Sequence, residues 1–138
     1  MTLRAVVRGV GHYLPERVVP NAAFEAMVDT SDEWIRSRSG IERRHFVADG
    51  ETTSQLATKA AERALAAAGM TGADVDAIVL ATSTADLTFP SAATMVQHAI
   101  GMKGGFAFDL QAVCAGFVYA LTQANALIVS GAAERVLV

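Results

Sequence analysis

The chain has 138 residues, enough for one domain with its own core, and a net charge of −3 in which both signs are interspersed. Hydrophobic residues make up 52%, yet no apolar run is long enough to span a bilayer, and nothing in the motifs or the overall charge is typical of nucleic-acid binding. A single cysteine and the lack of a signal-peptide pattern predict a reducing, cytoplasmic location.

The N-terminal third predicts short elements separated by turns. Residues 3–10, Leu-Arg-Ala-Val-Val-Arg-Gly-Val, predict a first strand. Asn21 is expected to cap a short helix that carries Phe24, and residues 42–47 are expected to be extended. Thr30 and Glu33 have the spacing of a capping box, which predicts a second short helix through Trp34.

The rest of the chain alternates helices with apolar strands. The predicted elements, in order, are a helix capped by Thr53 or Ser54 and stopped by Gly69, a strand at 75–81, a helix opened by Pro90 and Ser91 and running to Ile100, a strand at 106–110, a helix at 115–128 and a strand that starts at 135–138. This alternation predicts an α/β domain with a largely parallel sheet and right-handed crossovers. Because the chain stops inside an apolar strand pattern, we expect it to be incomplete.

Cys114 lies where the strand at 106–110 turns into the next helix. Backbone N–H groups without helical partners and the positive end of the helix dipole favour a thiolate at such a turn, so Cys114 is a candidate nucleophile. The alternative is a buried free cysteine that packs as a small hydrophobe. An apolar face follows it, formed by Phe117, Val118, Leu121, Ala124 and Ile128.

Several other residues are candidates for a site, and most of them keep more than one interpretation. Trp34 either packs in the core or stacks on a ligand ring, with Arg38 one helical turn away. Phe89, on a predicted loop, either completes the core or inserts into a partner subunit. The histidines His12, His45 and His98 have no neighbourhood that demands catalysis, and no cluster has metal-ligand spacing, so no metal site is predicted. The basic group at Arg36, Arg38, Arg43, Arg44 and His45 fits a solvated face, a phosphate site or an acidic partner.

The segment from Asp109 to Leu121, with Cys-Ala-Gly-Phe at 114–117, resembles the active-site segment of the 3-oxoacyl-(acyl carrier protein) synthase III family, the condensing enzymes that start fatty-acid synthesis. Further motifs match the family in the right order along nearly the whole chain: Gly11-x-Tyr13-Leu14-Pro15-Glu16, Asp29-Thr30-Ser31-Asp32-Glu33-Trp34-Ile35, Arg38-x-Gly40-Ile41 and Phe89-Pro90-Ser91-Ala92-Ala93. Several independent motifs make the resemblance specific.

The resemblance implies a three-layer, thiolase-like α/β fold with a mostly parallel mixed sheet and helices on both faces. It implies that Cys114 takes an acyl group from acyl-CoA and that Trp34 and Arg38 sandwich the CoA adenine. Thr30 resembles a neighbouring nucleotide contact, which as the capping residue would also set the helix end that carries Trp34. Phe89 resembles the residue that crosses a homodimer interface to bound the partner's acyl pocket. No cofactor is implied beyond acyl-CoA as substrate, and malonyl-acyl carrier protein is the implied acceptor.

The chain departs from the family in matching only its first half, so residues 1–138 are expected to be an N-terminal half-domain. The family's catalytic histidine and asparagine, and a glycine of its oxyanion hole, come from the second half and have no match here. We therefore expect that this chain alone is at most acylated at Cys114, that it does not condense, and that it exposes surfaces which the missing half covers. Two alternatives stay open: a synthase III-like enzyme of secondary metabolism, and a non-catalytic remnant or pairing subunit.

Overall fold

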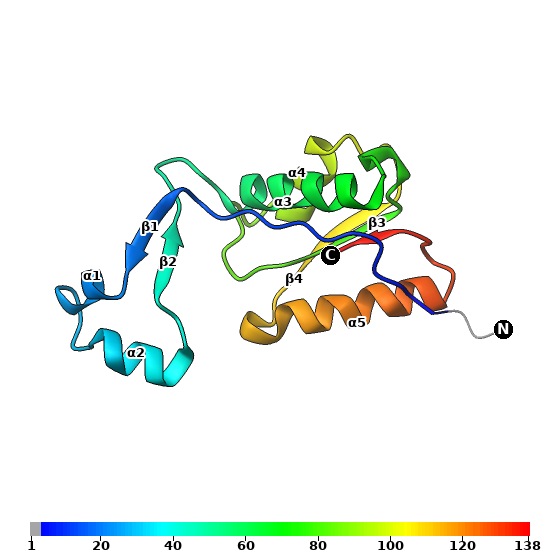
Figure 1. Cartoon of the computed structure of the whole chain (residues 1–138). Coiled ribbons are helices and arrows are strands. Elements are labelled where there is room, and N and C mark those ends of the chain that lie inside the picture. Colours follow the sequence, from blue (N-terminus) through cyan, green and yellow to red (C-terminus); the bar gives the residue numbers. More distant parts are fainter. Residues whose placement is uncertain (1–3) are drawn as a thin grey trace. The chain divides into compact units, whose positions relative to one another are not determined.

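The structure is a computed structural model, and it describes residues 4–138. The chain divides into a larger compact unit, Met1–Tyr13 with Thr52–Val138, and a smaller one, Leu14–Glu51 (Figure 1). Among the described residues, no helix is both long enough and apolar enough to cross a membrane. The assignment of residues 1–138 to one half-domain stays a prediction.

The larger unit is built on a parallel sheet. Its strands are β3 (Ala77–Ala81), β4 (Phe106–Leu110) and β5 (Val136–Leu137), and β3 lies between the other two. In this register Val79 is opposite Phe108, and Ala77 is opposite Val136. The α/β class and the parallel sheet predicted from the alternation of elements are confirmed.

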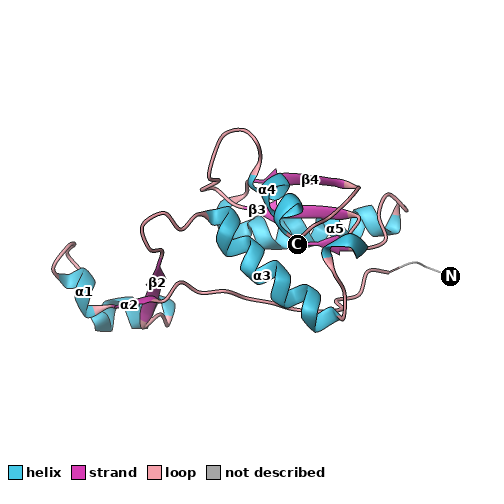
Figure 2. Cartoon of the chain, turned by 90° about the horizontal axis from the view of Figure 1, so that it is seen from above, coloured by secondary structure: helices cyan, strands magenta, loops and turns pink. Residues whose placement is uncertain are grey.

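Helices cover both faces of this sheet, as predicted. Helices α3 (Thr53–Ala68) and α4 (Ala92–Ala99) lie on one face, and α5 (Gly116–Val129) lies on the other (Figures 1 and 2). The buried core between α3, α4 and the sheet consists of Ala61, Leu65, Val75, Ile78, Ala93, Val96 and Met102. Because side chains alternate along a strand, Ile78 points into this core while Ala77 and Val79 are buried on the side of α5.

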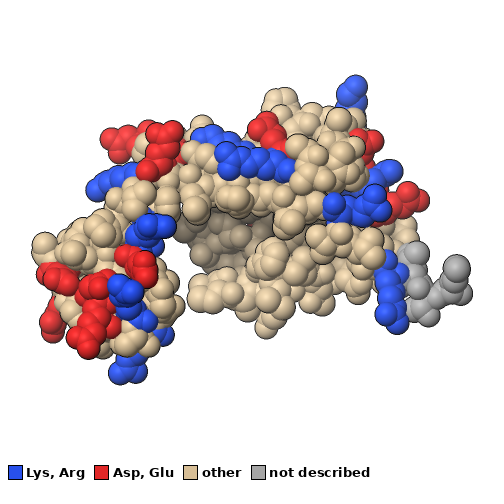
Figure 3. Space-filling view, in the orientation of Figure 1, with Lys and Arg blue, Asp and Glu red and all other residues tan. Residues whose placement is uncertain are grey.

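The side of α5 that packs on the sheet is made of small residues. Gly116, Ala120 and Ala124 are buried, and a Cβ added at Gly116 would lie 3.1 Å from the Cβ of Ala81. Three large residues of the predicted apolar face point elsewhere, since Phe117 is 62% exposed, Val118 61% and Leu121 41%, whereas Ile128 is half-buried. Figure 3 shows that the surface over α5 is almost free of charged groups. The expectation that this chain exposes apolar helix surface is therefore met within the larger unit.

The strand predicted at residues 3–10 is wrong for the described part, 4–10. This segment carries no strand and runs along α3, while Val6, Val7 and Val10 are exposed. Its glycines explain the path, because a Cβ on Gly9 or Gly11 would overlap backbone atoms of α3. A strand requires a hydrogen-bonding neighbour, and the described residues offer none beside this segment. Residue 3 lies outside the described residues.

The start of α3 differs by one or two residues from the prediction. Thr52, not Thr53 or Ser54, is the N-cap, and its backbone N–H donates to Gln55 Oε1 at 3.1 Å in a capping box. Ser54 is not free to cap the helix because its own hydroxyl and N–H bond to Asp86. Gly69 ends the helix as predicted, with a φ of 67° that favours glycine.

The smaller unit pairs β1 (Arg17–Pro20) with β2 (Arg43–Phe46) in antiparallel register and also contains α1 (Ala22–Glu25) and α2 (Asp32–Ser39). The extended segment at 42–47 is confirmed by β2. Asn21 stands at the start of α1, but its buried side chain does not cap that helix. It donates to Asp32 and to the Ile41 carbonyl and accepts from Arg44, so it ties the unit together instead.

Candidate active site

Cys114 lies on a short 3₁₀ turn, Val113–Ala115, that joins β4 to α5, as the strand-to-helix pattern predicted. Its side chain is exposed. The turn follows the carboxyl end of β4, and this end of parallel strands is where α/β sheets bind ligands. Cys114 is therefore accessible at the end of the sheet where α/β folds bind their ligands.

The residue before the cysteine has an unusual backbone. Val113 has a φ of 46°, in the left-handed region that a β-branched residue rarely adopts. Such a conformation costs about 1–3 kcal/mol, and it is concentrated at functional sites. Sequence patterns do not reveal this feature, because valine is unexpected at a positive φ. The strained backbone of Val113 is therefore evidence that the turn carrying Cys114 is a functional site.

The loop between β3 and α4 meets the same edge of the sheet. Its first residue, Thr82, donates its N–H at 3.1 Å to the carbonyl of Leu110, the last residue of β4. Phe89 lies farther along this loop and is 87% exposed. The predicted loop position of Phe89 is confirmed, and the side chain does not complete the core of this chain.

The first part of this loop is tied to the N-terminus of α3. Thr53 Oγ1 donates to the Thr84 carbonyl at 2.6 Å, and Ser54 donates from its N–H and its hydroxyl to Asp86 at 2.9 and 2.5 Å. Burial raises the pKa of Asp86, but the bonds from the Ser54 hydroxyl and N–H favour the ionised form and hold that pKa below its usual range. The carboxylate is thus an anchor for the loop.

The end of the loop is tied to β4 through Asp109. Its carboxylate accepts the N–H groups of Ala92 and Ala93, the first residues of α4, at 2.9 and 2.7 Å. The motif from Asp109 to Cys114 was recognised in the sequence, but the role of the aspartate was not. The role of Asp109 could have been inferred from its position in an otherwise apolar strand, because a carboxylate in such a place needs hydrogen-bond donors.

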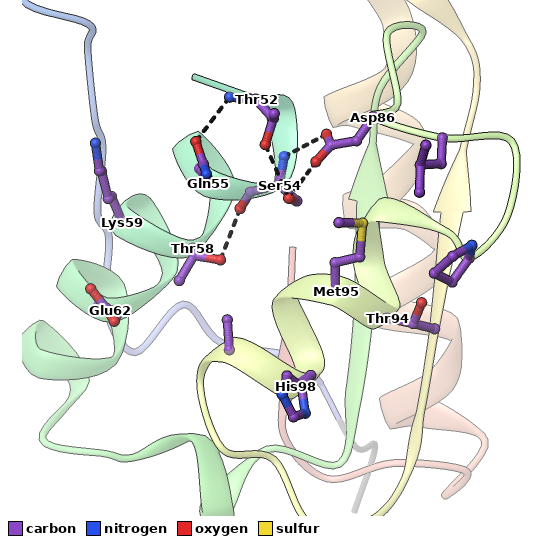
Figure 4. Close-up of a pocket in the computed structure, with 13 residues that line it drawn as sticks. Thr52, Ser54, Gln55, Thr58, Lys59, Glu62, Asp86, Thr94, Met95 and His98 are labelled. Atoms are coloured by element: carbon purple, nitrogen blue, oxygen red, sulfur yellow. Dashed lines mark hydrogen bonds between the residues drawn. The ribbon is translucent and has the colours of Figure 1, made fainter. Parts of the chain in front are cut away.

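A groove of about 950 Å³ lies between α3 and α4, and Asp86, Leu87 and Pro90 of the same loop border it. Figure 4 shows side chains from the two helices and Asp86 around this groove. Its other lining residues are Thr52, Ser54, Gln55, Thr58, Lys59, Glu62, Thr94, Met95, His98 and Ala99. None of the predicted site residues lines it. The groove therefore borders the loop that carries Phe89 without including Cys114.

In the smaller unit, Trp34 and Arg38 are neighbours on α2. The Arg38 guanidinium carbon lies 5.8 Å from the centre of the Trp34 ring, and Trp34 is 58% exposed. The spacing of one helical turn predicted for this pair is confirmed. An exposed indole beside a guanidinium is able to stack on a flat ring or contact a phosphate.

The predicted capping role of Thr30 is wrong. Ser31 is the N-cap of α2, and its hydroxyl accepts the Trp34 N–H at 3.1 Å. The helix begins one residue later than the Thr30–Glu33 pattern predicts, because the Ser31 hydroxyl binds the N–H three residues on, at Trp34, in place of the expected pairing of Thr30 with Glu33. Thr30 is half-buried next to this cap, and its proposed contact with a nucleotide stays a prediction.

Some members of the basic group at residues 36–45 make contacts within the smaller unit. Arg36 pairs with Asp32 and with Glu42, at 3.7 and 3.1 Å, and Arg44 lies over the Phe24 ring while donating to Asn21. His45 Nδ1 lies 2.6 Å from the Pro15 carbonyl. No group of three potential metal ligands occurs among residues 4–138.

Comparisons with known proteins agree with these observations. A family profile described as 3-Oxoacyl-[acyl-carrier-protein (ACP)] synthase III matches residues 108–138. The whole chain is 78% identical to the beta-ketoacyl-[acyl-carrier-protein] synthase III of Ruegeria pomeroyi and 72% identical to that of Cereibacter sphaeroides. In both cases it spans 43% of the relative's length.

Solved structures agree as well. The structure of 3-oxoacyl-[acyl-carrier-protein] synthase III from Aquifex aeolicus has 46% identity and a TM-score of 0.85, covering 91% of this chain and 41% of that one. The priming beta-ketosynthase of the R1128 polyketide pathway has 37% identity and a TM-score of 0.84, covering 92% and 38%. The chain is therefore similar over its whole length to the N-terminal 43% of curated 3-oxoacyl-(acyl carrier protein) synthase III enzymes, and it has a thiolase-like fold.

Proposed function

We propose that this chain is the N-terminal part of a condensing enzyme that transfers an acyl group from acyl-CoA to Cys114 and condenses it with malonyl-acyl carrier protein. The observation that carries the proposal is the exposed Cys114 on the turn after β4, next to the strained Val113. It lies in a segment that matches the profile of the family, within a chain 78% identical to a curated synthase III.

The first half-reaction is an acyl transfer. The Cys114 sulfur attacks the thioester carbonyl of acyl-CoA, a new carbon–sulfur bond forms, and the bond to the CoA sulfur breaks. CoA leaves as its thiol with the proton that Cys114 gave up, so no oxidant or further reactant is needed. The backbone N–H of Cys114 is our candidate for one donor to the oxyanion, because it lies just before the first turn of α5.

The second half-reaction forms the carbon–carbon bond. Malonyl-acyl carrier protein loses CO₂, and the resulting carbanion attacks the acyl-Cys114 carbonyl. The 3-oxoacyl product leaves on the carrier protein and the cysteine is regenerated, as in ping-pong chemistry. The histidine, asparagine and oxyanion glycine for this step belong to the part of the enzyme beyond residue 138, and we assign none of His12, His45 and His98 to it.

The remaining site residues bind substrate. Trp34 and Arg38 hold the CoA adenine between them, and Thr30 contacts the nucleotide nearby. The exposed indole beside a guanidinium supports this role. Phe89 bounds the acyl pocket of the partner in a homodimer, and its 87% exposure on a loop supports that placement. Acyl-CoA is a substrate, and we propose no further cofactor.

Intact-mass spectrometry of the purified polypeptide tests the first step. After incubation with acetyl-CoA we expect the mass to increase by one acetyl group in the wild type and not in Cys114→Ser. Val118→Ala serves as the matched control, because it changes an exposed side chain of α5, the helix that follows Cys114, and leaves the cysteine in place. The deciding measurement is on the full-length enzyme, of which this chain is the N-terminal part. If its wild type gains no acetyl group, or if Cys114→Ser gains the group equally, the proposal is refuted.

A synthase III-like enzyme of secondary metabolism is a second candidate. The 37% identity to the R1128 priming beta-ketosynthase favours it, although identity to curated synthase III relatives is about twice as high. The two candidates are separated by measuring the rate of condensation with malonyl groups carried by a fatty-acid carrier protein and by a polyketide carrier protein. A preference for the fatty-acid carrier supports the first candidate.

A further inference from the structure

The loop that carries Phe89 is held at two places, and the stretch between them is short. Asp86 is bound by Ser54 at the start of α3, and the N–H groups of Ala92 and Ala93 are bound by Asp109 on β4. Phe89 is the middle residue of the intervening stretch, 87–91. Its position is therefore determined largely by where these two carboxylates hold the chain.

Asp109 holds the first turn of α4 to β4, which is a different role from that of the N-cap of α4. Ser91 already caps this helix, because its hydroxyl accepts the Thr94 N–H at 3.3 Å. Without Asp109 the helix would keep that cap, but its first turn would lose its two bonds to β4. The distinctive effect of Asp109 is thus to fix α4, and the loop before it, to the strand that leads to Cys114.

We propose that Asp109 is a positioning residue that sets the place of Phe89 and thereby the length of the acyl chain that the enzyme accepts. The inference rests on the proposed function, in which Phe89 bounds an acyl pocket. The residue does not touch the reacting atoms. It acts through the two N–H bonds at the start of α4, so its removal changes the choice between acyl chains more than the chemistry of transfer.

The test measures acylation of Cys114 in the full-length enzyme with acetyl-CoA and with octanoyl-CoA, and takes the ratio of the two rates. In Asp109→Asn, which loses the charge and one acceptor, we expect this ratio to change roughly tenfold, the effect of altering a pocket wall by about one methylene group. Asp109→Glu keeps the charge but moves the carboxylate by one methylene group, and it gives a second variant should Asp109→Asn fold poorly.

Asp76→Asn is the matched control. Its carboxylate also accepts two backbone N–H groups, from Glu134 and Arg135 at 3.1 and 2.8 Å, but it precedes β3 at the opposite edge of the sheet. We expect it to lower the free energy of unfolding as Asp109→Asn does and to leave the ratio unchanged. A changed ratio in Asp76→Asn would show that selectivity follows stability alone, and it would overturn the inference.

A double-mutant cycle with Phe89→Ala completes the test. If Asp109 acts through Phe89, Asp109→Asn changes the ratio by less than about twofold once Phe89 is alanine. A full effect in that background, or an unchanged ratio in Asp109→Asn and Asp109→Glu, refutes the positioning role. If the wild type accepts no acyl group from either substrate, it is the proposed function that fails, so the two failures are distinguishable.

Discussion

Asp86 accepts two hydrogen bonds from a single residue, Ser54, one from the backbone N–H and one from the hydroxyl. This pair joins the loop after β3 to the first turn of α3, although the two residues are 32 positions apart. Because the bonds favour the ionised carboxylate, the folded state holds the pKa of Asp86 below its usual range, and the link depends on pH.

The first prediction concerns acid stability. A carboxyl group with a lowered pKa in the folded state stabilises the fold above its unfolded pKa, and this contribution is lost as the pH falls toward the folded value. At pH 7 we expect Asp86→Asn to lower the free energy of unfolding by about 1 kcal/mol. Urea unfolding between pH 7 and pH 3 should show the difference from wild type shrinking with acid. A constant difference across that range would contradict the linkage.

The second prediction concerns the path of the N-terminal segment over α3. Gly11→Ala places a Cβ against the Ala60 carbonyl and the Ala64 N–H, and backbone atoms of a helix move little. We expect a loss of about 1–3 kcal/mol in the free energy of unfolding. The control is Gly104→Ala, since nothing lies within 4 Å of a Cβ at that position. Equal thermal midpoints for the two variants would argue against the close approach.

The third prediction concerns the exposed apolar side of α5. In this chain alone, the triple variant Phe117→Ser, Val118→Thr and Leu121→Gln should be more soluble than wild type and should bind less of a hydrophobic dye, because these side chains face solvent. The comparison is Ala124→Gln, which puts a polar group into the buried side and should destabilise the unit. Sedimentation of the cleared lysate measures the soluble fraction. Unchanged solubility of the triple variant would mean that another surface drives association.

The fourth prediction separates Ser31 from Thr30. Ser31→Ala removes the cap of α2 and should cost about 1 kcal/mol, whereas Thr30→Ala leaves that cap intact. Trp34 is the chain's only tryptophan and lies on α2, so its fluorescence follows unfolding of the smaller unit. The opposite order of the two effects would restore the capping box predicted from sequence.

The fifth prediction tests CoA binding in the smaller unit. Adding CoA should quench Trp34 fluorescence, and Arg38→Ala should weaken binding by roughly fivefold, the value of an exposed cation–π contact. Arg36→Ala is the matched control, because Arg36 lies on the same helix as Arg38 but pairs with Asp32 and Glu42. If both variants bind CoA alike, the stacking role of Arg38 fails.

Much of the fold follows from the residues alone. The helix at 53–68, which Gly69 ends, and the strand at 106–110, which Gly104 and Gly105 precede, are strongly periodic or continuously apolar, so local preferences and tertiary packing agree. The apolar strand predicted at 75–81 is found two residues shorter, at 77–81. The position of Cys114 on a turn follows from the same patterns, since it needs only the end of one element and the start of the next. The family motifs are likewise contained in short segments.

Tertiary structure decided what depends on residues far apart in the chain. The helix after Cys114 is apolar nearly all round, so only its close packing against Ala81 determines that the small residues face the sheet. Asn21 was a plausible cap by type, but Asp32, Ile41 and Arg44 offered it better partners. Asp109 acquired its role from Ala92 and Ala93 on another element. Hydrogen bonds and van der Waals packing act over a few ångströms in space, and sequence periodicity carries no record of which distant groups meet.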